Sequence, residues 1–262
     1  MTVYAVDTQS HYYPCFDLEQ YVQSSIKNLL TAGPGTNTNR DNTQAVIFLT
    51  DVPGENWFEK LSNQQIKLPG WTLTAEKQSL TLSRDQQSLL MVCSRQLNTQ
   101  EGIEILLLGC QTDILPDQPL NHYVEQYAKE YLLVLPWGLG KWLGRRGQQV
   151  QAAIQQHRHD ILLGDNGGRP KLWSSVPEFT VADQLNVPIL PGSDPLPIPN
   201  QVHRSGTNGV LIESTESQPE NQVQQILAQL KAGKFTPFRH HRPPLNVALD
   251  QILLRLLKPN KK

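Results

Sequence analysis

The stretch VDTQSHYYPCFD, residues 6–17, continues the apolar segment VYAV at residues 3–6, and the two together indicate how the chain begins to fold. The apolar segment predicts a buried first strand. Asp7 and His11 stand where this strand ends, and a carboxylate and an imidazole are suited to bind a metal ion. Strand residues at i and i+2 share a face, so a second histidine at position 9 would bind the same ion. Gln9 stands there instead, and because glutamine is neutral and binds divalent metals poorly, we expect a weakened metal site.

Short apolar segments alternate with segments of helical spacing along the rest of the chain. We expect further strands over residues 45–52, 102–110, 131–138, 161–168, 187–195 and 209–214. We expect helices over residues 18–33, 55–66, 121–130, 145–158, 179–185 and 221–233, the first of them capped by Asp17 and stopped by Gly33. Residues 71–99 alternate between apolar and polar types and predict a small antiparallel insertion that feeds a central strand. Strands that alternate with helices indicate parallel β-α units.

Polar residues gather directly after the predicted strands. They form the pairs Gln9/His11, Arg95/Gln96, Trp137/Gly138, Asp165/Asn166 and Ser193/Asp194. In a parallel barrel such positions converge on one rim, where active sites lie, whereas in an open sheet they converge only at a switch point. Five such positions favour an α/β fold with a single distorted (β/α)7–8 barrel of the TIM type. We expect the barrel to cover residues 1–235, followed by an arm and an amphipathic helix over residues 236–262.

The composition limits the class of protein and its partners. The chain has 262 residues, of which 18% are charged, and a formal net charge of -1, so we expect no nucleic-acid partner. The expected ligand is a small anionic molecule, because the basic segment at residues 136–147 suits an anion. No stretch is long and apolar enough to predict a membrane span, and the N-terminus does not resemble a signal peptide. The three cysteines are widely spaced and odd in number, which is typical of a reduced, cytoplasmic protein. The composition does not determine the oligomeric state.

Carboxylates at the strand ends are candidates for metal binding and catalysis. Asp194 suits metal binding or water activation together with His11, and Asp7 and Gln9 complete the set of candidate metal ligands. Asp165 is a second catalytic candidate, in a flexible glycine-rich frame. Each carboxylate also has a structural alternative, because Asp194 precedes a proline and can cap a turn, and the sequence DNGG that begins at Asp165 is common in turns.

A glycine-rich basic segment, PWGLGKWLGRRG at residues 136–147, suits an anion. Backbone amides, a helix N-terminus and the side chains of Lys141 and Arg145 would contact a phosphate, although the spacing differs from that of a Walker loop. The alternative is a basic loop with its two tryptophans packed beneath it. The other candidates for substrate binding, all at strand ends, are Arg95, Gln96, Trp137, Asn166 and Ser193.

Taken in order, these segments resemble the polymerase-and-histidinol-phosphatase (PHP) family of metal-dependent phosphoesterases. The opening motif of the family, a strand followed by D-x-H-x-H, corresponds to VDTQSH, in which Asp7 and His11 match and Gln9 replaces the first histidine. Gln96 stands where the family has a metal-bridging glutamate, and the segment VLPWG lacks the histidine that usually ends a later strand. The closing G-S-D-x-H corresponds to GSDPL, in which Asp194 is kept and leucine replaces the last histidine.

The resemblance covers roughly residues 3–200 and implies a distorted seven-stranded barrel with a metal-dependent hydrolase site. The family holds up to three metal ions, but the replacements remove charge and basicity from the metal cage. We therefore expect one divalent ion (Zn, Mn or Mg) at most, held by His11 and Asp194 with or without Asp165.

Three hypotheses for function follow from this pattern. The first is a phosphoesterase that acts on an anionic substrate through one bound metal ion. The second is an inactive binding protein on the same barrel, in which the glutamines bind a ligand directly. The third is a scaffold that works through its leucine-rich terminal helix. Metal content separates the first hypothesis from the second, and truncation of residues 243–262 tests the third.

Overall fold

The computed structural model describes residues 2–32, 42–170, 173, 175–214, 222–240 and 243–257, in which the strands form one sheet. The strand order is β11-β10-β1-β2-β5-β6-β7-β8-β9, with β4 paired to β5 and β3 paired to β4. The strands are β1 (Thr2–Ser10), β2 (Thr43–Asp51), β3 (Thr72–Ala75), β4 (Ser79–Arg84), β5 (Gln87–Asn98), β6 (Glu104–Leu108), β7 (Leu132–Pro136), β8 (Ile161–Asn166), β9 (Ile189–Gly192), β10 (Gly209–Ser214) and β11 (Thr236–Phe238). The helices are α1 (Leu18–Leu30), α2 (Trp57–Ser62), α3 (Leu120–Tyr127), α4 (Arg145–Gln156), α5 (Pro177–Gln184), the 3-10 helix η2 (Pro199–Arg204), α6 (Gln222–Lys231) and α7 (Pro244–Leu257).

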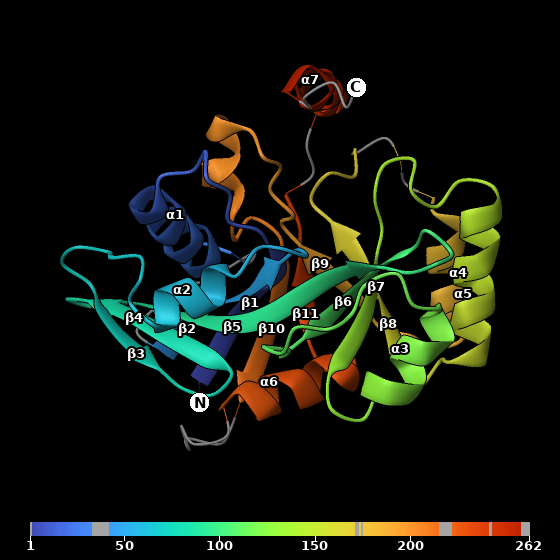
Figure 1. Cartoon of the computed structure of the whole chain (residues 1–262), viewed down its shortest axis with the longest axis horizontal. Coiled ribbons are helices and arrows are strands. Elements are labelled where there is room, and N and C mark those ends of the chain that lie inside the picture. Colours follow the sequence, from blue (N-terminus) through green and yellow to red (C-terminus); the bar gives the residue numbers. More distant parts are fainter. Residues whose placement is uncertain are drawn as a thin grey trace.

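The strands β1, β2, β5, β6, β7, β8 and β9 form the wall of a nearly closed barrel. Strands β1, β2 and β5 are parallel, and β7, β8 and β9 are parallel. Strand β6 is antiparallel to both of its neighbours, β5 and β7. The other six strands therefore point the same way, and their carboxyl ends meet at one end of the barrel (Figure 1).

The direction of β6 corrects the expectation of uniformly parallel β-α units. Only a tight turn separates β5 from β6, in which the Thr99 amide donates to the Ile103 carbonyl at 2.9 Å and Gly102 has a φ of 73°. A parallel neighbour needs a crossover of a dozen or more residues, so a turn this short forces an antiparallel pair. The predicted insertion is confirmed, because β3, β4 and β5 form antiparallel pairs on the outer side.

Strand β9 approaches β1 and so brings the two ends of the wall together. The backbone amide of Asp194 donates to the carbonyl of Gln9 at 2.9 Å, and the Thr8 hydroxyl donates to the carbonyl of Pro191 at 2.9 Å. Gly192 makes this approach possible, because a Cβ atom there would lie 2.8 Å from the backbone nitrogen of Gln9. Strand β10 pairs with β1 on the edge opposite to β2, and β11 pairs with β10, both antiparallel.

The barrel interior is filled by alternate strand residues and by one helix. Val46 and Phe48 of β2 and Leu90 and Val92 of β5 belong to the same buried cluster as Ile226 of α6. Figure 1 shows α6 beside the N-terminal ends of the strands. Helix α6 therefore closes the amino end of the barrel, and the carboxyl end is left for the polar side chains.

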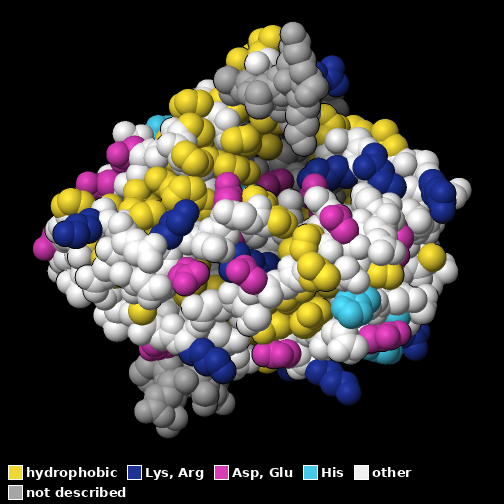
Figure 2. Space-filling view, in the orientation of Figure 1, with side chains coloured by type: hydrophobic (Ala, Val, Ile, Leu, Met, Phe, Trp, Pro, Cys, Tyr) yellow, Lys and Arg dark blue, Asp and Glu magenta, His cyan; other side chains and the backbone are white. Residues whose placement is uncertain are grey.

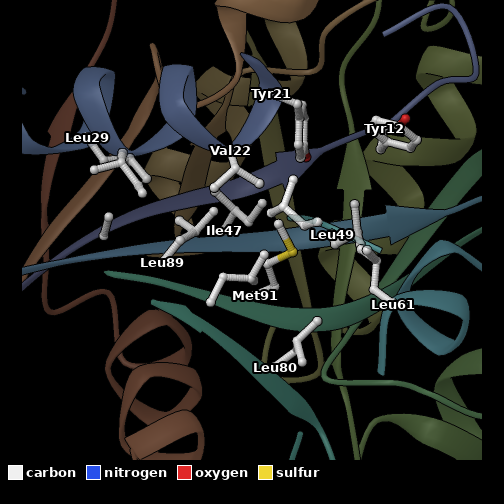
Figure 3. Packing of buried hydrophobic residues seen from close by; sticks show 14 of the residues in the cluster. Tyr12, Tyr21, Val22, Leu29, Ile47, Leu49, Leu61, Leu80, Leu89 and Met91 are labelled. Atoms are coloured by element: carbon white, nitrogen blue, oxygen red, sulfur yellow. The ribbon is translucent and has the colours of Figure 1, made fainter. Parts of the chain in front are cut away.

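Two further hydrophobic clusters lie outside the wall. Figure 3 shows one of them, in which Tyr21, Val22 and Leu29 of α1 pack over Ile47 of β2 and Leu89 of β5. The second cluster joins β6, β7 and β8 to helices α3, α4 and α5. Because both faces of these strands are buried, their sequences are continuous apolar runs without the alternation that marks a one-sided sheet.

The last described element is α7, which confirms the expected C-terminal helix. It lies beyond the carboxyl ends of the strands and stands apart from the other helices (Figure 1). Its side chains Leu245, Leu249, Ile252 and Leu256 are 49–74% exposed. The division into a barrel over residues 1–235 and an arm over 236–262 remains a prediction.

Several local expectations can also be compared with the structure. Asp17 caps α1, since its carboxylate accepts the Gln20 amide at 2.8 Å. Gly33, the expected stop of that helix, lies outside the described residues. Cys93 and Cys110 are buried free thiols, as expected. Among the described ranges we find no helix with the length and apolar character needed to cross a membrane.

Candidate active site

His11 lies at the carboxyl end of β1 and is almost fully buried, with 2% exposure. Its Nδ1 atom is 2.7 Å from the carbonyl oxygen of Thr50. Because a carbonyl only accepts, Nδ1 carries a proton, and the neutral imidazole therefore has its lone pair on Nε2. That atom lies 3.4 Å from Oδ1 of Asp194. Two lone pairs at this distance repel each other unless a proton or a cation lies between them.

Asp194 follows β9 and is held in position by its neighbours. Its backbone has a φ of 42°, which is unusual for a residue with a side chain and is typical of functional sites. Its Oδ2 atom accepts a hydrogen bond from Asn166 Nδ2 at 2.8 Å, and Asn166 also donates to the Trp137 carbonyl. Asn166 in turn accepts the Gly168 amide at 3.0 Å. These contacts leave Oδ1 of Asp194 directed toward His11.

Two glutamines complete the group around His11 and Asp194. Nε2 of Gln9 lies 3.5 Å from Nε2 of His11 and 3.5 Å from Oε1 of Gln96. Both distances are at the long limit for a hydrogen bond, so these amides are only loosely engaged with each other. We call Gln9, His11, Gln96 and Asp194 the rim cluster. The structure thus brings together residues from β1, β5 and the end of β9.

Asp7 has a different environment from the rim cluster, although it is only two residues from Gln9. Its carboxylate accepts the backbone amides of Gln9 at 3.2 Å, Ser193 at 2.9 Å and Gly206 at 2.9 Å, as well as the Ser193 hydroxyl. Burial raises the pKa of Asp7 to about 6, and these hydrogen bonds limit the rise. Both oxygens of Asp7 accept hydrogen bonds, and those from Ser193 link β1 to the end of β9.

The geometry of the rim cluster fits one divalent ion. Two ligands bound at about 2.0–2.1 Å to a tetrahedral ion lie about 3.4 Å apart, which is the separation of His11 Nε2 and Asp194 Oδ1. The bond from Nδ1 of His11 to the Thr50 carbonyl is the usual support of a metal-binding histidine. In the described part of the chain, no group of three or more His, Cys, Asp or Glu residues is placed to hold an ion. The donor set therefore suits one ion bound by imidazole and carboxylate, with amide oxygens as weak additional ligands.

The rim cluster opens into a cavity of about 500 Å³. Its wall includes Tyr13, Glu104, Lys141 and Arg204 as well as Gln96, Asn166 and Asp194. Lys141 forms an ion pair with Glu104, and its aliphatic chain packs against Gly138, where a Cβ would clash. Nη2 of Arg204 donates to the Gly167 carbonyl at 2.8 Å. Two cationic groups thus lie on the wall of a cavity that also contains an aspartate and an imidazole nearby.

Tyr13, Glu104 and Arg204 are site residues that the sequence reading missed. The Tyr13 ring stacks on His11 with centroids 5.8 Å apart. Burial, together with the negative charge of Asp194, raises the pKa of the Tyr13 phenol, which therefore stays protonated and can donate a hydrogen bond. Tyr13 lies two residues after His11, so its position directly after the first predicted strand could have indicated it. Arg204 and Glu104 do not follow a strand, and no comparable sequence pattern indicates them.

Three of the expected site residues point to the outer side of the barrel. Arg95 donates to the Glu55 carbonyl and to Asn56, each at 2.9 Å, and pairs with Asp113 at 2.8 Å. The side chain of Trp137 lies in the outer cluster and contacts the Trp173 ring edge-on. Neither side chain lines the cavity, so the structure does not place Arg95 or Trp137 with the rim cluster.

Asp165 is the third of these residues. Arg169 binds its two carboxylate oxygens at 2.8 Å each, and Arg239 approaches within 2.9 Å. It lines a separate cavity of about 700 Å³ beside α5. The neighbouring residue Asn166 points inward, because successive residues of a strand face opposite sides. Arg145 is exposed at the start of α4 and also lies outside the rim cavity.

Comparison with known proteins relates the fold to solved structures. No family model and no curated protein sequence matches the chain. PsfC from Pseudomonas syringae PB-5123 is similar with a TM-score of 0.62 and 12% identity, over 98% of each chain. The lesion-specific endonuclease PfuEndoQ from Pyrococcus furiosus is similar with a TM-score of 0.50 and 11% identity, over 90% of this chain and 57% of that one. A structure of Endonuclease Q with a 27-mer duplex that carries an abasic lesion at the active site has a TM-score of 0.48 and 10% identity, over 90% of this chain and 58% of that one.

The expectation that nucleic acid is excluded as a partner is wrong. A lesion-specific endonuclease, PfuEndoQ, is among the proteins with a similar fold. Net charge reports the balance over the whole surface and not its distribution. Figure 2 shows lysine and arginine side chains gathered at the upper right of one face, although the chain is close to neutral.

The comparisons support the barrel at the level of fold. PsfC shares the fold over 98% of each chain, and the strands of this chain form a nearly closed, barrel-shaped sheet. The antiparallel β6 departs from the regular (β/α)7–8 arrangement that the sequence suggested. The chain therefore has a mixed α/β fold with a nearly closed, barrel-shaped sheet, and the rim cluster lies at the carboxyl end of that barrel.

Proposed function

We propose that the chain is a metal-dependent phosphoesterase that works with a single divalent ion bound between His11 and Asp194. The observation that carries the proposal is the 3.4 Å separation of His11 Nε2 and Asp194 Oδ1, with Nδ1 of His11 held by Thr50. The PHP-like barrel and an endonuclease among its structural neighbours support a hydrolase. A binding protein without metal has less support, because the imidazole and the carboxylate are both present and aligned.

Four residues of the cavity wall have distinct roles in this proposal. When bound, a divalent ion acts as a Lewis acid and lowers the pKa of water. Asn166 holds one oxygen of Asp194 and so keeps the other directed at the ion site. Lys141 and Arg204 place positive charge on the wall where the phosphate of a substrate would lie. Tyr13 remains protonated and donates a hydrogen bond to the same group.

The substrate proposed for this site is a phosphate ester, and DNA strands belong among the candidates. A phosphodiester is anionic and is recognised by Lys and Arg side chains as point charges or in bidentate pairs. The endonuclease among the structural neighbours supports testing DNA with base lesions or abasic sites beside small aryl phosphates. The imidazole ligand favours Zn²⁺, and the carboxylate and amide oxygens suit Mn²⁺, so these two ions are the first to test.

Metal binding tests the proposal without the need for a substrate. We expect calorimetric titration of metal-free protein with Zn²⁺ or Mn²⁺ to show one site per chain. Gln9→His is expected to raise the affinity about 10- to 100-fold, since an imidazole at position 9 would lie within reach of the same ion. The matched control is Gln148→His, at an exposed position on α4, which is expected to leave this affinity unchanged.

Two results would contradict the metal centre. Wild-type protein and Gln9→His that both fail to bind either ion would remove it and would favour the binding-protein alternative. Equal gains in affinity for Gln9→His and Gln148→His would show that the added histidine acts at the surface and not at the rim cluster.

A further inference from the structure

Helix α7 forms one wall of the cavity that is lined by Gln96 and Asp194 of the rim cluster. The residues that line the cavity from α7 are Val247, Asp250, Gln251 and Leu254. They face Gln96, Asn166 and Asp194, which come from the strand ends. The sequence places α7 more than 50 residues after Asp194, and only the tertiary structure brings it over the site (Figure 1).

The side of α7 that meets the cavity differs chemically from the other side. The lining residues 247, 250, 251 and 254 follow the i, i+3, i+4, i+7 spacing of a single helix face. Val247 is 5% exposed and Asp250 is 4% exposed, whereas Leu249 on the opposite side is 49% exposed. A carboxylate that is this deeply buried needs a hydrogen-bond or ionic partner, so this face of α7 packs in one defined position.

Gln201 provides one such partner. Its Nε2 atom donates to Oδ2 of Asp250 at 2.9 Å, and Gln201 is itself only 3% exposed. Gln201 belongs to η2, which is fixed to α1, because Asn28 donates to the carbonyls of His203 at 2.9 Å and Ser205 at 2.8 Å. The hydrogen bond from Gln201 to Asp250 therefore attaches α7 to a rigid part of the barrel.

We propose that α7 is the specificity-determining wall of the active site and that Gln201 and Asp250 keep it in place. This inference rests on the proposed phosphoesterase function and names the substrate class. With α7 seated, the cavity of about 500 Å³ has the size of a site for one nucleotide-sized group. It accepts a phosphate ester carried by a flexible single strand or a nucleotide, and it excludes an uninterrupted duplex until α7 moves away.

The packing of α7 over the cavity is tested by thiol labelling, which does not depend on activity. A Cys15→Ser background removes the exposed native thiol, while Cys93 and Cys110 are buried. In this background we expect maleimide to modify Val247→Cys at least about tenfold more slowly than Leu249→Cys. Adding Asp250→Ala is expected to remove most of that difference, whereas Asp250→Asn keeps an oxygen acceptor for Gln201 and is expected to preserve it. Equal labelling rates for the two cysteines in the Cys15→Ser background would show that α7 does not pack over the cavity.

Substrate selection tests the role of the wall. We measure kcat/KM for bis(p-nitrophenyl) phosphate, a single-stranded oligonucleotide and the same oligonucleotide as an intact duplex. Asp250→Ala is expected to raise the ratio of duplex to single-strand cleavage at least about tenfold, and Asp250→Asn is expected to leave it near the wild-type value. An unchanged ratio in Asp250→Ala, in a variant whose labelling shows a released α7, would overturn the specificity role.

The two proposals fail in different ways. If wild-type protein cleaves none of the three probes with Zn²⁺ or Mn²⁺, the phosphoesterase proposal fails, and the wall has no substrate to select. Labelling would still decide whether α7 is seated on Gln201. If wild-type protein cleaves the duplex as well as the single strand while Val247→Cys stays protected, the phosphoesterase stands and the wall is refuted.

Discussion

Replacing Asp194 with asparagine is expected to lower kcat/KM for phosphodiester hydrolysis on the order of a thousandfold. In the proposed metal centre the carboxylate is one of the two strong ligands, and Oδ1 faces His11 Nε2 at 3.4 Å. Lewis-acid assistance by a metal ion supplies several kcal/mol of transition-state stabilisation, and a factor of ten in rate is about 1.4 kcal/mol. The amide keeps the shape of the side chain but binds a divalent ion weakly, so the loss reports chemistry rather than packing.

The same substitution elsewhere provides the control. Asp183→Asn lies on the exposed side of α5 and is expected to stay within twofold of the wild-type rate. Thermal unfolding of both variants in EDTA shows whether either change disturbs the fold. If Asp194→Asn retains activity within tenfold of wild type, hydrolysis does not proceed through an ion at this residue, and the mechanism proposed for the rim cluster is wrong.

The free energy of unfolding is expected to decrease as the pH rises from about 4 to about 6, because of Asp7. Burial raises the pKa of this carboxyl from 3.8 to about 6, so the folded state holds a proton that the unfolded state releases over this range. The contribution to the free energy of unfolding is fully present below pH 4, is lost as the pH rises through 6, and is constant above that. Its size is about 3 kcal/mol.

The variant Asp7→Asn isolates this contribution, because an amide does not titrate. We expect urea unfolding in EDTA to show that wild type loses about 3 kcal/mol relative to Asp7→Asn between pH 4 and pH 7. Ser193→Ala removes the hydroxyl donor to Asp7, and since that donor lowers the pKa, the variant should shift the window upward. A difference that is independent of pH, or that grows as the pH rises, would show that the surrounding donors outweigh burial.

Some features of the site were predictable from neighbouring residues in the chain. Asp17 was recognised as a helix cap, and His11 and Asp194 were chosen because each follows an apolar run. The structure places these two side chains within 3.4 Å of each other, although 183 positions separate them, and their role as metal ligands remains a prediction. The proximity of these two residues could be predicted because parallel strands bring their carboxyl ends to one rim of a barrel.

The direction of individual side chains was not predictable in the same way. Arg95 and Gln96 are adjacent, yet Gln96 faces the cavity and Arg95 binds the outer shell. Asp165 and Asn166 divide in the same manner, with Asp165 bound to Arg169 outside. Strands that are buried on both faces show no alternation of polar and apolar residues, so nothing in the sequence indicates which member of each pair points inward.

The sequence by itself determined most of the strands and helices, because periodicity and capping are local properties of the chain. Strand β11 was not among them, since its residues were expected to belong to an arm. The sequence also identified the strand ends that carry polar groups, and it suggested a PHP-like barrel with a depleted metal site. Only the tertiary structure decided the inward or outward direction of each polar side chain and the position of α7 over the cavity. These depend on contacts between segments far apart in the chain, such as Gln201 with Asp250, for which no local pattern exists.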